Sequence, residues 1–196
     1  MMDTAALLLY LVVSSITPGP NNLMSLYLGA NYGLRRSRRF LYGSTAGFAA
    51  KALICGLLNM ALASAVPAAV PYLKWLGAAY MLYLAFCMLR GGFREERTDG
   101  VRGGEATFAA GILLQVVNVK SWISCLSMYS VYVIGHTTAP AVMLAVALAA
   151  TVLIGGSALC WMCFGSAFQA VYRAHRRVFS AVLALSLVLC AITALR

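Results

Sequence analysis

The stretch that decides the fold is Thr4–Leu34, TAALLLYLVVSSITPGPNNLMSLYLGANYGL, in which 31 consecutive residues carry no charge. A helix needs ~20 apolar residues to cross a bilayer, so this stretch is long enough for a membrane span. Further uncharged stretches contain 22, 52 and 18 residues, and the longest has room for two crossings. They lie between Lys51 and Lys74, between Lys120 and Arg173, and between Arg177 and Arg196.

The composition of the whole chain also indicates a membrane protein. Of its 196 residues, 62% are hydrophobic and 10% are charged, and the mean hydropathy is +0.85. A soluble domain averages about 25% charged residues, so neither a soluble globular fold nor a disordered chain fits. The net charge of +10 comes from 15 basic and 5 acidic residues. Because the basic residues form short clusters between apolar stretches, they indicate membrane topology and not nucleic-acid binding, and the expected partner is the lipid bilayer.

These stretches predict an all-α polytopic membrane protein, a single six-helix domain over residues 1–196. The polar sequence around His136 divides the longest stretch, and the Gly-rich segment 91–106 is expected to be a flexible cytoplasmic linker. With three helices on each side of this linker, the two halves cross the membrane in opposite senses, as in the 3+3 inverted repeats of many secondary transporters. The expected helices lie near residues 4–28, 40–64, 70–90, 107–134, 140–169 and 178–195.

The distribution of Lys and Arg predicts the orientation. Eleven of the 15 basic residues fall in the connections after the first, third and fifth expected helices. The positive-inside rule places these connections in the cytoplasm and both termini on the outer side. The sequence begins Met1-Met2-Asp3, with no basic residue before the apolar run, so we expect a first mature helix and not a cleaved signal peptide.

The first expected helix contains a sequence that a regular helix cannot accommodate, Thr17-Pro18-Gly19-Pro20-Asn21-Asn22. Each proline lacks a backbone N–H and its ring clashes with the carbonyl one turn earlier, while the glycine lets the backbone leave helical angles. Pro20 followed by two asparagines suits the start of a second half-helix. Irregular backbone inside a membrane is tolerated where it lines a cavity, so this break is a predicted substrate site.

The fourth expected helix carries a second polar patch, formed by Gln115, Asn118 and Lys120. Gln115 and Asn118 are three residues apart and share one helix face. Lys120 lies ~18 Å beyond Phe108 along a helix, near mid-membrane, where an ionisable residue is a functional candidate. Lys51 also falls inside a span. Its sequence neighbours are Ala and Leu and its long side chain has room to snorkel toward the cytoplasm, so the sequence leaves its role open.

Taken together, these motifs resemble the lysine exporter (LysE/RhtB) superfamily over nearly the whole chain. The resemblance implies export of small amino acids across a bacterial inner membrane, and the fourth helix is most similar to the cysteine and O-acetylserine exporters. In such a membrane, the outer side predicted above for both termini is the periplasm. Many relatives have Asn-Pro-Lys where this chain has Asn118-Val119-Lys120, and valine allows a continuous helix, so the sequence leaves open whether the helix 107–134 is broken. The other matching motifs are the Thr17–Asn22 sequence, Gly43-x-x-x-Gly47-Phe48, Leu76-Gly77-Ala78-Ala79-Tyr80 and Tyr83-Leu84-Ala85.

For an amino acid substrate, both patches supply candidate contacts. The carboxylate would bind the N–H groups of Asn21, Asn22 and Leu23 at the half-helix start, and the ammonium would bind carbonyls freed between Ser14 and Thr17. The predicted spans contain two lysines and no carboxylate, so a cationic substrate would be repelled and a small neutral amino acid is expected. The predicted substrate-binding residues are Thr17, Pro18, Gly19, Pro20, Asn21, Asn22, Gln115, Asn118 and Lys120.

Two other classes of function remain as alternatives. A transmembrane thiol–disulfide electron carrier could use Cys160-x-x-Cys163, but it needs a reactive cysteine beside each broken helix, and the first helix has none. A metal-cation efflux protein would need carboxylates or clustered thiolates in the membrane, whereas every acidic residue is Asp3 or lies in 91–106. No Walker A motif or nucleophile–base pair is present, so no enzyme, cofactor or metal is expected. The sequence leaves both a monomer and a homo-oligomer open.

Overall fold

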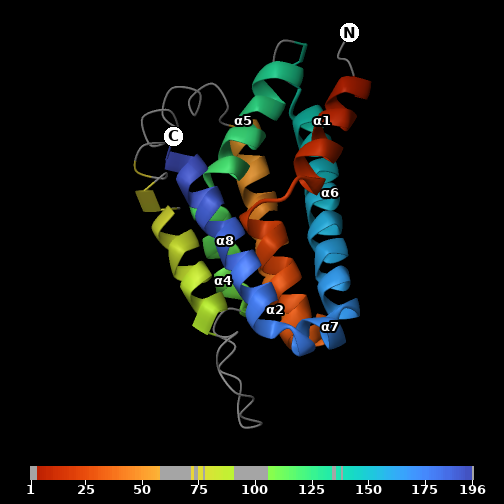
Figure 1. Ribbon diagram of the computed structural model, residues 1–196. Coiled ribbons are helices and arrows are strands. Elements are labelled where there is room, and N and C mark those ends of the chain that lie inside the picture. The colour runs from red at the N-terminus through yellow and green to blue at the C-terminus, as the bar shows by residue number, and fades with distance from the viewer. Residues whose placement is uncertain are drawn as a thin grey trace.

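The structure is a computed structural model that describes residues 4–57, 72, 75–76, 78–90, 106–133, 136–137 and 139–195. All regular structure in these residues is helical, which confirms the all-α prediction. The helices are α1 (Thr4–Ile16), α2 (Pro20–Leu57), an unlabelled helix Ala78–Arg90, α4 (Phe108–Val117), α5 (Val119–Tyr132), α6 (Pro140–Ala167), α7 (Gln169–Ala174) and α8 (Arg176–Leu195). Figure 1 shows them packed as a bundle, with α1 beginning and α8 ending at the end opposite α7.

The predicted interruption of the first helix is confirmed. Helix α1 ends at Ile16 and α2 begins at Pro20, so the irregular backbone covers residues 17–19. Pro20 takes the first position of α2, where its missing N–H costs no helical hydrogen bond. The two helices therefore meet end to end at the place where proline and glycine interrupt the pattern.

Helix α2 consists of two helical limbs that meet at Gly33. This glycine has φ 70° and ψ 169°, angles outside a helix and strained for a residue with a Cβ. Ser37 Oγ donates a hydrogen bond of 2.9 Å to Leu28 O, although nine residues of continuous helix would separate them by about 13 Å. The chain therefore reverses at Gly33, and we call residues 20–32 the first limb and residues 34–57 the second limb.

This reversal corrects the predicted connection between the first two helices. The sequence predicted one helix to end near 28 and the next to begin near 40, with a basic loop between them. Instead a single glycine makes the turn, and Ser37 satisfies a carbonyl that the turn leaves without a helical partner. The exposed basic residues of the expected loop lie in the first turns of the second limb; they are Arg35, Arg36, Arg38 and Arg39.

The helix expected over 107–134 is broken, a point that the sequence left open. Helix α4 ends at Val117, α5 begins at Val119, and the two are bent by 65°. Asn118 caps α5, because its Oδ1 accepts a hydrogen bond of 3.3 Å from Ser121 N. Side chains, and not a proline, therefore stabilise this second interruption.

The remaining predicted helices agree with the structure where it describes them. The helices expected at 140–169 and 178–195 correspond to α6 and α8, and the short α7 occupies the expected connection between them. The helix expected at 70–90 is described from Ala78 to Arg90. The end of the helix expected at 40–64 and residues 91–105 of the predicted linker lie outside the described residues.

Glycines bring the central helices into backbone contact. A Cβ on Gly29 of the first limb would overlap Met162 O of α6, and a Cβ on Gly165 would overlap Leu26 O. Gly43 of the second limb approaches the backbone of α4 in the same way. Helix α2 therefore packs closely against both α6 and α4, as small residues allow in membrane bundles.

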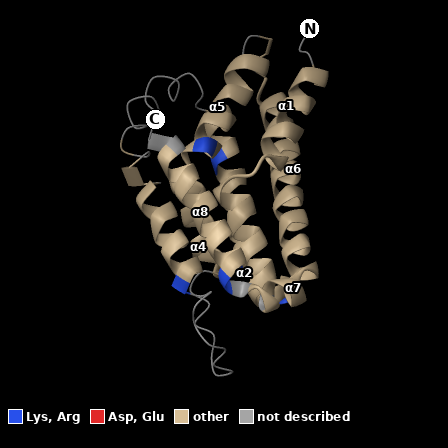
Figure 2. Cartoon of the chain, viewed as in Figure 1, with Lys and Arg blue, Asp and Glu red and all other residues tan. Residues whose placement is uncertain are grey.

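By length and composition, α2 and α6 are candidate membrane spans, and the bent α4–α5 pair is a third if it is counted as one. Because the chain reverses at Gly33, only the second limb of α2, residues 34–57, is long enough to cross a bilayer. Three shorter apolar helices accompany them, at Thr4–Ile16, Ala78–Arg90 and Arg177–Ile192. Large apolar side chains face outward, among them Val152, which is 72% exposed. Figure 2 shows Lys and Arg at the end of the bundle that carries α7 and beside α5, and no acidic side chain among the described residues.

Candidate functional site

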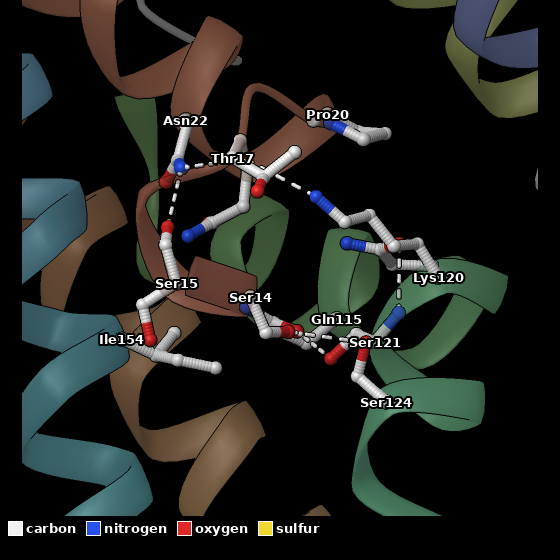
Figure 3. A pocket seen from close by; sticks show the side chains of 13 residues that line it. Ser14, Ser15, Thr17, Pro20, Asn22, Gln115, Lys120, Ser121, Ser124 and Ile154 are labelled. Carbon is white, nitrogen blue, oxygen red and sulfur yellow. Dashed lines mark hydrogen bonds between the residues drawn. The ribbon is translucent and has the colours of Figure 1, made fainter. Parts of the chain in front are cut away.

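The two helix interruptions line a partly open pocket whose lining residues are mostly polar. Its walls come from the end of α1, the start of α2, both sides of the α4–α5 break and one residue of α6 (Figure 3). Of the nine predicted site residues, all except Pro18 line it. The lining residues are Ser14, Ser15, Thr17, Gly19, Pro20, Asn21, Asn22, Gln115, Asn118, Lys120, Ser121, Ser124 and Ile154.

Two of the carbonyls that were expected to be free for the substrate ammonium, Ser15 O and Thr17 O, have side-chain partners. Asn22 Nδ2 donates to Ser15 O at 2.7 Å and to Thr17 O at 3.2 Å, which folds the α2 start back onto the α1 end. Ser157 Oγ of α6 also donates to Ser15 O, at 2.8 Å. The Asn22 side chain therefore holds the α1 end and the α2 start together across the break, and Figure 3 shows both of its hydrogen bonds.

The start of α2 presents unpaired polar groups to the pocket. The first turn of a helix leaves its N–H groups without helical acceptors, but Pro20 has none and Leu23 N donates to Gly19 O at 2.9 Å. The expected role of the Leu23 N–H is therefore wrong, and Asn21 and Asn22 supply the available N–H groups of this turn. Asn21 Oδ1 is buried without a hydrogen-bond partner, and its residue is only 8% exposed. A buried acceptor without a partner is costly, so this atom is suited to a donor on a ligand.

Lys120 reaches across the pocket from the start of α5. Its Nζ donates to Thr17 O at 3.1 Å and to Pro18 O at 3.4 Å, two carbonyls at the α1 end. A Cβ on Gly19 would lie 3.2 Å from this Nζ, so the glycine leaves room for the lysine. Pro18 does not line the pocket, but its carbonyl accepts a hydrogen bond from Lys120. The ammonium stands over the α1 C-terminal end, where the helix dipole favours a positive charge.

Both sides of the α4–α5 break are tied together by side chains. Ser121 Oγ donates to Gln115 Oε1 at 3.0 Å. Lys51 Nζ donates to Gln115 O and, at 3.0 Å, to Ser121 Oγ. Lys51 is only 3% exposed, so its side chain does not snorkel toward the membrane surface. The structure therefore joins this lysine of the second limb to the α4–α5 break.

Sequence reasoning missed several residues around the pocket. Ser121 and Ser124 follow Asn118 at three-residue intervals on one face of α5, a spacing that could have identified them. Ser14 Oγ donates to Ser124 Oγ at 3.3 Å and so links the two broken helices directly. Ile154 is an apolar residue of α6 and has no distinguishing sequence signal.

The cysteines of α6 lie away from these groups. Cys160 and Cys163 are both exposed on the outer surface of the bundle, and neither lines the pocket. Among the described residues, no three His, Cys, Asp or Glu side chains are grouped so as to hold a metal ion.

Two interrupted helices that meet around a pocket lined mostly by polar residues, inside an apolar bundle, are an arrangement found in many membrane transporters. The chain belongs to the LysE type translocator family, whose family model matches residues 12–196.

Curated relatives are similar over almost the entire chain. Proteins from Escherichia coli (strain K12), Escherichia coli O9:H4 (strain HS) and Shigella sonnei (strain Ss046) are each 34% identical over 183 residues, which is 93% of this chain and 92% of theirs. Each of these relatives is named a cysteine/O-acetylserine efflux protein. No solved structure gives a significant match.

Proposed function

We propose that this protein exports small neutral amino acids, of the cysteine, O-acetylserine, serine or threonine kind, across the bacterial inner membrane. The observation that carries the proposal is the pocket between the two helix breaks, which offers Lys120, the N–H groups at the α2 start and the unpartnered Asn21 Oδ1 within one small space. These groups complement the carboxylate and ammonium that every amino acid carries. The names of the relatives support the same class of substrate.

The substrate carboxylate would bind the N–H groups of Asn21 and Asn22, where the α2 dipole favours an anion. Lys120 would turn from the Thr17 and Pro18 carbonyls to the same carboxylate. The ammonium would donate to Asn21 Oδ1 and to the side-chain oxygens of Gln115 or Asn118 on the opposite wall. Each charged end of the substrate then has a partner, as transfer from water requires.

Selection against cationic amino acids follows from the charges in the bundle. The described residues contain no Asp or Glu, while Lys51 and Lys120 both lie close to the pocket walls. A second ammonium ~6 Å from a lysine, at an effective dielectric of about 20, is repelled by roughly 3 kcal/mol, or more than a hundredfold in binding. A neutral amino acid avoids this repulsion.

The proposed architecture is a single domain of six spans arranged as a 3+3 inverted repeat, with periplasmic termini. Support comes from the matching positions of the breaks, since the first helix of each half is the interrupted one. The exposed arginines near Gly33 lie at the opposite end of the bundle from the α1 start, as a cytoplasmic connection requires (Figures 1 and 2).

Efflux from proteoliposomes tests this function. Vesicles containing the purified protein are loaded with labelled cysteine, O-acetylserine, serine, threonine, leucine, lysine or arginine, and release is compared with protein-free vesicles under one set of gradients. We expect the small neutral compounds to leave fastest. Asn21→Ala and Asn118→Ala should abolish export without preventing insertion. Lysine or arginine as the best substrate, or no accelerated release of any amino acid, would refute the proposal.

A further inference from the structure

Lys51 is the most deeply buried cation of the described residues, and the proposed substrate contacts do not use it. It lies on the second limb, and its Nζ is surrounded by three acceptors: Gln115 O, Ser121 Oγ at 3.0 Å and Gln115 Oε1 at 3.5 Å. Three acceptors match the three donors of an ammonium group. The Trp122 ring, whose centroid lies 4.9 Å from Nζ, adds a cation–π contact. These three acceptors and the ring all favour a positive charge at this position.

The position of Lys51 mirrors that of Lys120. Lys120, in the second half of the chain, donates to Thr17 O and Pro18 O beyond the end of α1 in the first half. Lys51, in the first half, donates to Gln115 O in the last turn of α4 in the second half. Each interrupted helix thus has its negative dipole end covered by a lysine from the opposite half.

The two lysines differ in their access to the pocket. Lys120 is partly exposed and lines the pocket, so it is free to change partners. Lys51 is 3% exposed and stands behind the wall, with Gln115 and Ser121 between its ammonium and the pocket. Its charge is therefore fixed in place, and no carboxylate side chain among the described residues neutralises it.

We propose that Lys51 is a positioning and specificity-determining residue of the pocket. Its ammonium holds Gln115 and Ser121 in their orientation on the wall, and its fixed positive charge disfavours substrates with a cationic side chain. This inference rests on the proposed transport of neutral amino acids and assigns part of the selection to a residue that does not touch the substrate.

Three substitutions separate the charge from the hydrogen bonds. Lys51→Arg keeps both, Lys51→Gln keeps a donor without the charge, and Lys51→Met keeps only the apolar stem. Each protein is reconstituted in proteoliposomes, and KM and kcat are measured for labelled serine and labelled lysine. Insertion is checked by the yield of monodisperse protein in detergent.

The charge predicts that the serine-to-lysine ratio of kcat/KM falls about tenfold in Lys51→Gln and Lys51→Met, the effect of a unit charge ~10 Å away at an effective dielectric of about 20. Lys51→Arg should keep the wild-type ratio. The hydrogen bonds predict a higher KM for serine in Lys51→Met than in Lys51→Gln. A residue with a merely structural role would lower the yield and leave the ratio unchanged.

Equal serine-to-lysine ratios in the Arg and Gln variants overturn the inference, and this comparison holds even if Lys51→Met does not insert. If the two ratios are equal, transport of serine by the wild type still supports the proposed function. If the wild type moves neither serine nor cysteine, the proposed function and this inference fail together, so the two failures are distinguishable.

Discussion

Lys120 Nζ lies 3.1 Å from Thr17 O, although 103 residues separate the two in the chain. The contact places an amine on a carbonyl of the first helix break, a position that the ammonium of a substrate would otherwise suit. The protein therefore satisfies this carbonyl with its own cation. A substrate that enters has to offer Lys120 a better partner, and a carboxylate is such a partner because charge-assisted hydrogen bonds are stronger.

Replacement of Lys120 tests this exchange. Lys120→Ala should lower serine efflux at least tenfold, because one charge-assisted hydrogen bond is worth about 1.5–3 kcal/mol. Lys120→Arg should retain part of the activity, since it keeps the charge. Efflux from proteoliposomes measures both. Val131→Ala, on an exposed position of the same helix, is the matched control and should transport normally. Full activity in Lys120→Ala would remove this residue from the mechanism.

Substitutions of the two asparagines at the α2 start should separate an effect on transport from an effect on stability. Asn21→Ala removes a side-chain oxygen that has no partner, so thermal unfolding in detergent should change little while transport is lost. Asn22→Ala breaks two hydrogen bonds to the α1 end and should destabilise the protein by about 1–3 kcal/mol. If Asn21→Ala transports normally, or destabilises as much as Asn22→Ala, the assignment of Asn21 to the substrate is wrong.

Helix packing predicts contrasting effects at two glycines of α6. Gly165→Ala puts a Cβ onto Leu26 O and should markedly reduce the yield of folded protein, because backbone cannot move aside as a side chain can. Gly156→Ala faces open space and is the matched control, and it should be neutral or slightly stabilising. Size-exclusion chromatography of detergent extracts compares the two. Equal yields would contradict the close contact between α2 and α6.

The turn at Gly33 makes a separate prediction. Gly33→Ala places a Cβ on a residue with φ 70° and ψ 169°, a region that essentially only glycine adopts, and should destabilise the protein by about 1–3 kcal/mol. Gly33→Asn should cost about as much, because asparagine tolerates the left-handed helical region and not this one. Thermal unfolding in detergent should place both variants below the wild type. If alanine is as stable as glycine, the chain does not reverse here with these angles.

The two helix breaks show how far the sequence could predict the site. The first break was predictable because proline and glycine interrupt a helix wherever they occur. The break at Asn118 was not, because Val119 is compatible with a helix and one partner of the residues at the break is Lys51, which is 64 residues away from Gln115 in the sequence. The sequence around Asn118 gives no signal for a partner that is so far away in the chain. The helix pattern and most pocket residues were therefore accessible, whereas the partner of each polar group was not.

The turn at Gly33 could not be predicted from the sequence, for a related reason. The arginines after it were taken as a loop because charge usually marks a connection, but they are able to continue a helix from the membrane surface. The reversal itself needs only one residue with a positive φ and one hydroxyl, Ser37, to bond the carbonyl of Leu28. Gly33 does not stand out among the 17 glycines of the chain, and no sequence signal marks Ser37 as the partner of a carbonyl.

The contact between Lys51 and Gln115 also bears on how the protein is made. The ribosome adds the 64 residues that separate them at about 5–20 per second, so Gln115 follows Lys51 by roughly 3–13 seconds. During that interval the second limb carries an amine whose acceptors have not yet been synthesised. The hydrogen bond from this amine to Gln115 therefore forms only after α4 has been synthesised, so the second limb reaches its final packing late in the synthesis of the chain.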